Sequence, residues 1–102
     1  MLELRPTCEN CNKPLPANSR EARICSYECT FCANCVEEVL FNVCPNCGGG
    51  FMPRPIRPFR NWVGDNCLTN DPASTAVRHR PINREEHLAF LANIRHIPPE
   101  DR

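Results

Sequence analysis

The sequence predicts a small, loop-rich α+β fold that does not depend on a large apolar core. Three observations lead to this fold class. The chain has only 102 residues, and its mean hydropathy of −0.46 indicates little material for such a core. It contains nine cysteines and eleven prolines, which is a high share of both residue types. Its helical and extended patterns are short, and chains of this kind usually need cross-links in addition to burial.

Eight of the nine cysteines occur as four close pairs, which are Cys8/Cys11, Cys25/Cys29, Cys32/Cys35 and Cys44/Cys47. A pair at this spacing places both sulfurs on one side of a tight turn, where they can bind one ion together. Four pairs supply eight thiolates, the number that two tetrahedral sites require. Soft thiolate ligands favour two Zn²⁺ ions, and iron is a substitute that also fits, because the last pair resembles one knuckle of a rubredoxin.

Disulfide bonds are the competing interpretation of so many cysteines. They form in oxidising compartments, but the chain begins without the basic and apolar stretches of a secretory signal. Pairing the eight cysteines would also leave Cys67 alone. No apolar run approaches the roughly 20 residues that cross a bilayer. We therefore expect a cytoplasmic protein without a membrane segment, whose complete four-thiolate sites are structural rather than catalytic.

The segment after the third pair predicts how the pairs share the ions. It carries four aliphatic residues at the spacing of one helical face, Val36, Val39, Leu40 and Val43. Cys32 and Cys35 then lie in the first turn of a short helix, where the helix dipole favours thiolates. A knuckle, a hairpin and such a helix form a treble clef. This order favours a crossed pairing, with one site at Cys8, Cys11, Cys32 and Cys35 and the other at Cys25, Cys29, Cys44 and Cys47. Sequential pairing remains the alternative.

The cysteine spacing resembles a RING-type cross-brace finger over residues 8–50. Phe31 precedes the fifth ligand, a helix lies between the sixth and seventh, and the last pair reads Cys-Pro-x-Cys. This resemblance implies a two-zinc fold. RING ubiquitin ligases commonly carry an aliphatic residue where this chain has Asn10, and a cation beside the last ligand where it has Asn46 and Gly48. Ligase-like activity is therefore kept as an alternative, and we expect no enzyme.

A longer resemblance covers nearly the whole chain. Residues 21–35, residues 43–58 and the pair Asn61-Trp62 are similar to a small bacterial family known only as a domain of unknown function. The resemblance implies a bacterial, cytoplasmic, zinc-binding protein and supplies no activity.

Residues 51–82 read as a Pro/Arg-rich extended strap that follows the finger of residues 1–50. Prolines favour an extended path, and we expect the strap to lie on the finger through Phe51, Ile56, Phe59 and Trp62. Residues 54–84 carry six arginines against two aspartates, a net charge of +4 within a chain of net charge zero. Docking onto the chain's own anionic finger and binding to an external ligand both remain open. The candidate binding surface comprises Arg54, Arg57, Arg60, Trp62, Arg78 and Arg80.

Residues 83–97 predict a C-terminal amphipathic helix. Asn83 is a good N-cap with Glu86 three residues later, and Pro98 ends the pattern. We expect His87 to be a packing residue within an apolar stripe of Leu88, Phe90, Leu91 and Ile94. That stripe would pack on the finger or on a second protomer, so the chain would be a monomer or a homodimer.

No motif for a nucleophile, a phosphate loop or a redox centre is present. We expect Cys67 to be exposed or half-buried, without a role as a ligand. The function predicted is a non-catalytic protein-interaction or adaptor module with an unidentified protein partner. A zinc finger that binds nucleic acid through the arginines of 54–84 is one alternative, and a RING-type ligase is another.

Overall fold

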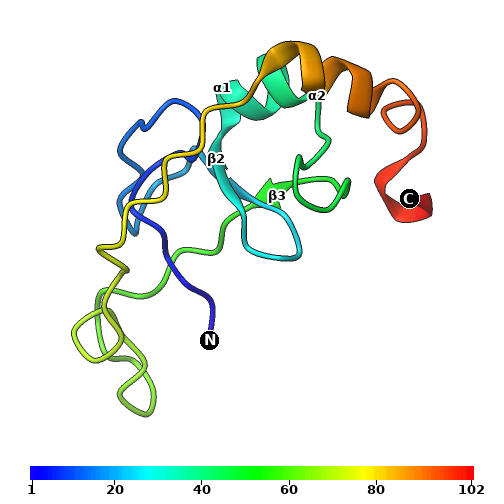
Figure 1. The fold of residues 1–102 in the computed structure, drawn as a ribbon. Coiled ribbons are helices and arrows are strands. Elements are labelled where there is room, and N and C mark those ends of the chain that lie inside the picture. Colours follow the sequence, from blue (N-terminus) through cyan, green and yellow to red (C-terminus); the bar gives the residue numbers. More distant parts are fainter.

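The computed structural model describes residues 1–102 as short elements joined by irregular segments (Figure 1). The strands are β1 (Ala22–Ile24), β2 (Thr30–Cys32) and β3 (Met52–Pro53). The helical segments are α1 (Ala33–Cys35), the π-helical turn η1 (Val36–Leu40), α2 (Arg84–Leu91) and the 3-10 turn η2 (Pro99–Asp101). This is the small α+β fold that the sequence predicts. None of the helices has both the length and the apolar character needed to cross a membrane.

The three strands form one antiparallel sheet in the order β2-β1-β3. β1 and β2 form the predicted hairpin, with Arg23 opposite Phe31. The turn of this hairpin holds Cys25 and Cys29, and Glu28 adopts a left-handed φ of 67° there. β3 pairs with the free edge of β1, so the chain that follows the fourth cysteine pair returns to the sheet.

The helix predicted after Cys32 is present as α1 and η1. Its aliphatic residues Val36, Val39 and Leu40 are buried, and Val43 is buried too, although the helical segment ends before it. Phe41 has a left-handed φ of 50° and ends the helical turn. The rings of Phe31 and Phe51 meet edge to face with their centroids 5.5 Å apart, which joins β2 to the start of the strap (residues 51–82).

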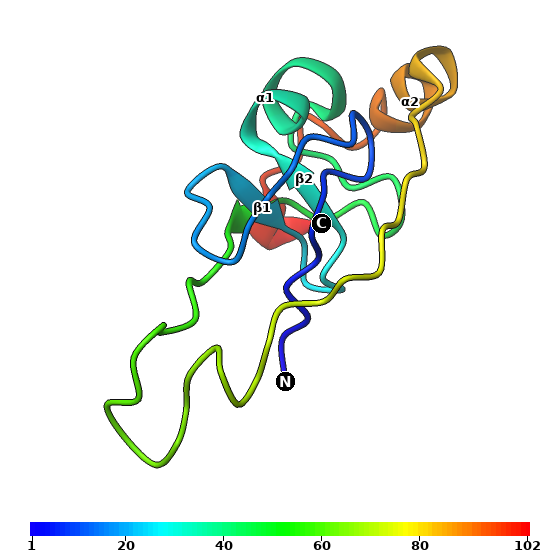
Figure 2. The same ribbon diagram turned by 90° about the vertical axis from the view of Figure 1, so that its left-hand side faces the viewer.

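The predicted apolar anchors of the strap are wrong at three of the four positions. Phe51 is buried, whereas Ile56, Phe59 and Trp62 are 49%, 77% and 72% exposed. Beyond residue 57 the chain leaves the body of the molecule and forms a projecting loop (residues 58–71). Figures 1 and 2 both show this loop at the end opposite to α2. Phe59 and Trp62 therefore have no body to pack against.

Two arginines fasten the strap instead. Arg54 is 4% exposed and donates hydrogen bonds to the carbonyl oxygens of Arg5, Leu15 and Pro16, at 2.8, 3.2 and 2.9 Å. Arg57 donates to the carbonyls of Leu2 and Asp71, both at 2.7 Å. A guanidinium has five N–H donors, which suits it to the carbonyls that irregular backbone leaves without partners.

Helix α2 begins as predicted but is shorter than residues 83–97. The side chain of Asn83 accepts a hydrogen bond from the Glu86 amide at 3.0 Å, as an N-cap does. The helix ends at Leu91, and turns follow it. The buried face is also narrower than the predicted stripe, because His87 and Leu91 are buried while Leu88 and Phe90 are 50% and 41% exposed.

His87 is the packing residue that the sequence predicts. It is 4% exposed, and its Nε2 lies 3.0 Å from the carbonyl oxygen of Leu40. This contact fixes α2 against the end of η1. At the chain terminus, Arg102 donates to the carbonyls of Asn42 and Gly48, which brings the last residues back to the fourth cysteine pair.

Candidate metal centre

The first group of sulfurs combines the first and third cysteine pairs. The Sγ atoms of Cys8, Cys11, Cys32 and Cys35 all lie within 4.8 Å of one another. Cys11 Sγ and Cys32 Sγ are 3.8 Å apart. Four sulfurs at about 2.3 Å from a tetrahedral ion would be separated by about 3.8 Å, so this spacing fits one metal ion.

The fold brings these pairs together from two directions. Cys8 and Cys11 lie in a tight turn that closes with the amide of Asn12 donating to the Cys8 carbonyl at 2.9 Å. Cys32 ends β2 and caps α1, because its sulfur accepts from the Cys35 amide at 3.5 Å. The hairpin and the helix predicted from the sequence therefore position Cys32 and Cys35 in this group.

Asn10 is a contributor that the sequence did not reveal. Its Nδ2 donates to Cys35 Sγ at 3.2 Å. A donor to sulfur stabilises the thiolate that a metal ion requires, and such partners orient metal ligands. The aliphatic residue that a RING ligase commonly has at this position could not make this hydrogen bond.

The second group combines the second and fourth pairs. The sulfurs of Cys25, Cys44 and Cys47 lie within 4.8 Å of one another. Cys29 adjoins this group, since its thiol interacts with those of Cys25 and Cys44, but its sulfur does not lie within 4.8 Å of all three. Both groups thus have the composition of the crossed pairing, and sequential pairing would require a different grouping.

Backbone amides point at the sulfurs of the second group. The amides of Tyr27, Asn46 and Gly49 donate to the sulfurs of Cys25, Cys44 and Cys47 at 3.3, 3.4 and 3.4 Å. In the last knuckle, Gly48 has a φ of +76°, a conformation that favours glycine. These turns therefore hold pairs of thiols together with the donors that stabilise their ionised form.

Burial and hydrogen bonds shift the pKa values of the clustered thiols. Burial raises the pKa of Cys35 and of Cys44 well above the ordinary range of a thiol. Burial acts in the same direction on Cys25, but the amides of Tyr27 and Cys29 outweigh it and lower the pKa of Cys25. Clustered, buried thiolates repel one another unless a positive ion lies between them. The two groups fit metal ions by donor type, number and spacing.

Residues 1–57, more than half of the chain, match the sequence model of a family described as "Protein of unknown function (DUF1272)". The chain belongs to this family. The "Uncharacterized protein R02474" of Rhizobium meliloti (strain 1021) is 51% identical over 81 residues, which cover 79% of this chain and 89% of that protein. No solved structure matches the chain. The matched segment includes all eight clustered cysteines, which agrees with the resemblance to a bacterial family.

The six residues of the candidate binding surface do not form one surface. Arg54 is buried, and Arg57 is half-buried with its guanidinium engaged by carbonyls. Arg60 and Trp62 are exposed in the projecting loop. The two others, Arg78 and Arg80, are exposed where the strap returns along the cysteine-rich region. The sequence groups these residues as one surface, but the path of the backbone separates them in the fold.

Cys67 is not exposed, in contrast to the expectation. It is 4% exposed within the projecting loop, and Asn70 Nδ2 lies 3.6 Å from its sulfur. It belongs to neither sulfur group, as expected.

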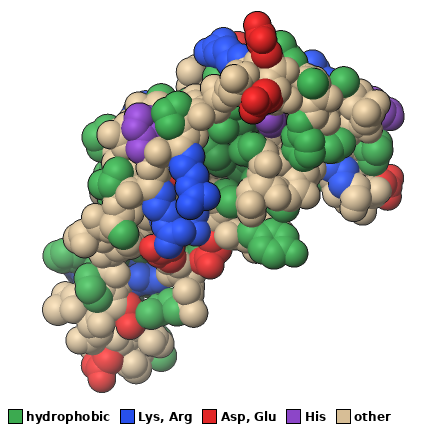
Figure 3. All heavy atoms as spheres, viewed as in Figure 1, with side chains coloured by type: hydrophobic (Ala, Val, Ile, Leu, Met, Phe, Trp, Pro, Cys, Tyr) green, Lys and Arg blue, Asp and Glu red, His purple; other side chains and the backbone are tan.

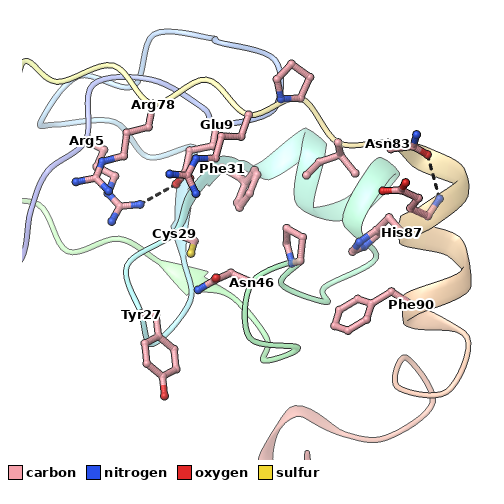
Figure 4. A pocket seen from close by; sticks show the side chains of 15 residues that line it. Arg5, Glu9, Tyr27, Cys29, Phe31, Asn46, Arg78, Asn83, His87 and Phe90 are labelled. Carbon is pink, nitrogen blue, oxygen red and sulfur yellow. Dashed lines mark hydrogen bonds and ion pairs between the residues drawn. The ribbon is translucent and has the colours of Figure 1, made fainter.

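A pocket of about 530 Å³ lies beside the second sulfur group. Figure 4 shows its walls, which come from the N-terminal segment at Arg5 and Glu9, the hairpin, the last knuckle, the returning strap and α2. Cys29, Phe31 and Asn46 line one side, and His87 and Phe90 line another. Sequence patterns could not predict this pocket, because it forms where segments from separate parts of the chain meet.

Proposed function

We propose that the chain binds two zinc ions in a RING-like crossed arrangement and acts as a non-catalytic protein-interaction or adaptor module. The observation that carries this proposal is the division of eight cysteine sulfurs into two groups, each built from pairs far apart in the chain. Four protein ligands per ion leave no position for a substrate or an activated water. The ions would therefore act as cross-links.

In this proposal each ion neutralises thiolates and fixes segments that the small core cannot hold alone. Cys8, Cys11, Cys32 and Cys35 would hold one ion, and Cys25, Cys29, Cys44 and Cys47 the other. Metal binding and folding are coupled in modules of this size, with apparent zinc free energies on the order of 10–16 kcal/mol. The amide and Asn10 donors described above would hold the thiolates ionised around each ion.

The tail supports a non-catalytic role over the ligase-like alternative. The resemblance implies that a ligase would present its central helix and the Pro45 loop to a conjugating partner. Here the strap contacts the first knuckle at Asn10, because the Ile82 amide donates to Asn10 Oδ1 at 2.9 Å and the His79 ring lies 3.0 Å from the Asn10 carbonyl. Helix α2 contacts the end of the central helix through His87.

The distribution of charge disfavours the nucleic-acid alternative. Arg54 and Arg57 are engaged within the chain, which removes two of the six cations in residues 54–84. Eight thiolates binding two Zn²⁺ would also change the formal charge from zero to −4. Affinity for nucleic acid rises with the number of phosphates that a protein neutralises. We therefore expect the chain to bind protein partners in preference to nucleic acid. A cytoplasmic location, and a monomer or a homodimer formed through the exposed side of α2, remain part of the proposal.

Two measurements test the proposed function. Elemental analysis of protein purified under reducing conditions should find two zinc ions per chain, and one ion per chain or iron in both sites would contradict it. A pull-down from the native bacterial extract, with and without nuclease, should retain the same protein partner in both conditions. A partner that is lost after nuclease treatment would indicate nucleic-acid binding instead.

A further inference from the structure

We propose that the pocket beside the second sulfur group is a docking site for a short peptide segment that carries an acidic side chain next to an aromatic or large aliphatic one. This inference rests on the proposed function as an interaction module and names the site and the chemistry of its partner. The pocket volume of about 530 Å³ lies within the roughly 300–1,000 Å³ typical of ligand sites.

The wall formed by the returning strap supplies cations. Arg5 is neutralised by Glu3 and Glu9, with nitrogen–oxygen distances of 3.0 and 2.9 Å. Arg78 has one longer contact, 3.4 Å from Glu3, and the guanidinium of Arg80 forms no ion pair. Figure 3 shows basic side chains gathered at the rim of a hollow below α2. Arg78 and Arg80 are therefore available to an acidic side chain.

The backbone of this wall is already fixed. The Arg80 amide donates to the Glu9 carbonyl at 2.7 Å, and the Ile82 amide is held by Asn10. Glu9 is itself buried, with its Oε2 accepting from the Thr30 amide at 2.6 Å. A preformed wall reduces the entropy lost when a ligand binds, which favours affinity for a short segment.

The remaining walls combine apolar and aromatic side chains with polar ones. Phe31, Pro45 and Phe90 line the pocket, and Tyr27 lies at its edge with 69% of its surface exposed. Figure 4 shows Phe31 and Phe90 on either side of the cavity, with Asn46 between the hairpin and the last knuckle. These surfaces suit an aromatic or aliphatic side chain, and the Asn46 amide can bond to a peptide backbone.

The charges around the pocket select a peptide over a polyanion. Glu86 lines the side of the pocket formed by α2, where its carboxylate would repel a second negative charge on the ligand. The chain with two zinc ions would also carry a net charge of −4, which repels nucleic acid at long range. A single carboxylate can instead be bound locally by the two arginines, with the neighbouring apolar side chain on the aromatic wall.

The first test selects peptides from a random phage-displayed library on the zinc-loaded full chain. We expect enrichment of sequences in which Asp or Glu is adjacent to Phe, Tyr, Trp or Leu. No enrichment, or enrichment of basic sequences, would overturn the pocket assignment. The pull-down described above decides the proposed function separately, so the two failures can be told apart.

The second test measures the affinity of a fluorescein-labelled synthetic peptide of the enriched sequence. Arg80→Glu and Phe90→Ala should each weaken binding about tenfold. The matched controls Arg60→Glu and Leu88→Ala, at exposed positions outside this pocket, should change affinity less than about twofold. Zinc content and NMR spectra confirm folding of each variant. Unchanged affinity in both pocket variants overturns the proposal. If Trp62→Ala weakens binding instead, the peptide binds to the projecting loop. That result would overturn the pocket site and leave only the proposed adaptor role.

Discussion

The cysteine-rich region (residues 1–50) and the strap are held by different kinds of interaction. In the first, eight thiols form two groups, and short elements bury aliphatic residues between them. In the second, guanidinium groups bond to backbone carbonyls, and large apolar side chains remain exposed. The strap therefore has almost no core of its own and depends on the surface that the cysteine-rich region presents.

The projecting loop extends this contrast, because its shape comes from polar side chains. Asn61 Nδ2 donates to Asp65 Oδ1 at 2.7 Å, and the Asp65 amide donates back to Asn61 Oδ1 at 3.0 Å. Asn70 Nδ2 donates to the Asp65 carbonyl at 2.8 Å. The loop is thus ordered by local hydrogen bonds, while the exposed Phe59 and Trp62 contribute nothing to its packing.

Removal of the metal should have the largest effect. A strong chelator should unfold the cysteine-rich region, because the loss of bound zinc removes on the order of 10 kcal/mol of folding free energy. The strap should detach at the same time, since its arginines bond to carbonyls of that region. Acidification should act in the same direction, because thiols must lose protons to bind metal. Circular dichroism and NMR check both results, and a strap that stays ordered without metal would contradict the dependence.

Loss of the Arg54 side chain should have the next largest effect. Arg54→Ala removes three hydrogen bonds, one of them to the carbonyl of the buried Leu15, so we expect a loss of about 2–4 kcal/mol in the free energy of unfolding. Arg60→Ala is the matched control, because Arg60 is exposed and should change stability by less than about 0.5 kcal/mol. Denaturant titration compares them, and equal effects would show that Arg54 does not fasten the strap.

The N-cap of α2 should contribute a smaller amount. Asn83→Ala removes the hydrogen bond to the Glu86 amide, and we expect a loss of about 1 kcal/mol. Hydrogen exchange should increase first in α2 and leave the hairpin amides unchanged. Faster exchange across the hairpin would mean that the helix and the cysteine-rich region are coupled more strongly than their contact through His87 indicates.

Cys67→Ser should not change the amount of metal that the chain binds. Cys67 lies outside both sulfur groups, so the variant should keep its full zinc content. Because Cys67 is buried, a hydroxyl in its place should lower stability by about 1–2 kcal/mol, confined to the projecting loop. Loss of one ion in this variant would show that the ligand set is incomplete as assigned.

The same contrast explains what could be predicted from the sequence. The helix after Cys32, the hairpin before it and the Asn83 cap follow from local patterns with a direct physical cause. The burial of Arg54 could not be predicted, because it depends on carbonyls that irregular backbone exposes far away in the chain. The role of Asn10 is equally non-local, since its partner sulfur is brought near only by folding.

The crossed grouping of the cysteines is the central claim, and cadmium NMR tests it most directly. Protein loaded with ¹¹³Cd allows each metal signal to be correlated with the Hβ protons of its cysteine ligands. The account predicts two metal signals, each joined to four cysteines. One signal should correlate with Cys8, Cys11, Cys32 and Cys35, and the other with Cys25, Cys29, Cys44 and Cys47. A single signal that correlates with Cys8, Cys11, Cys25 and Cys29 would contradict the account.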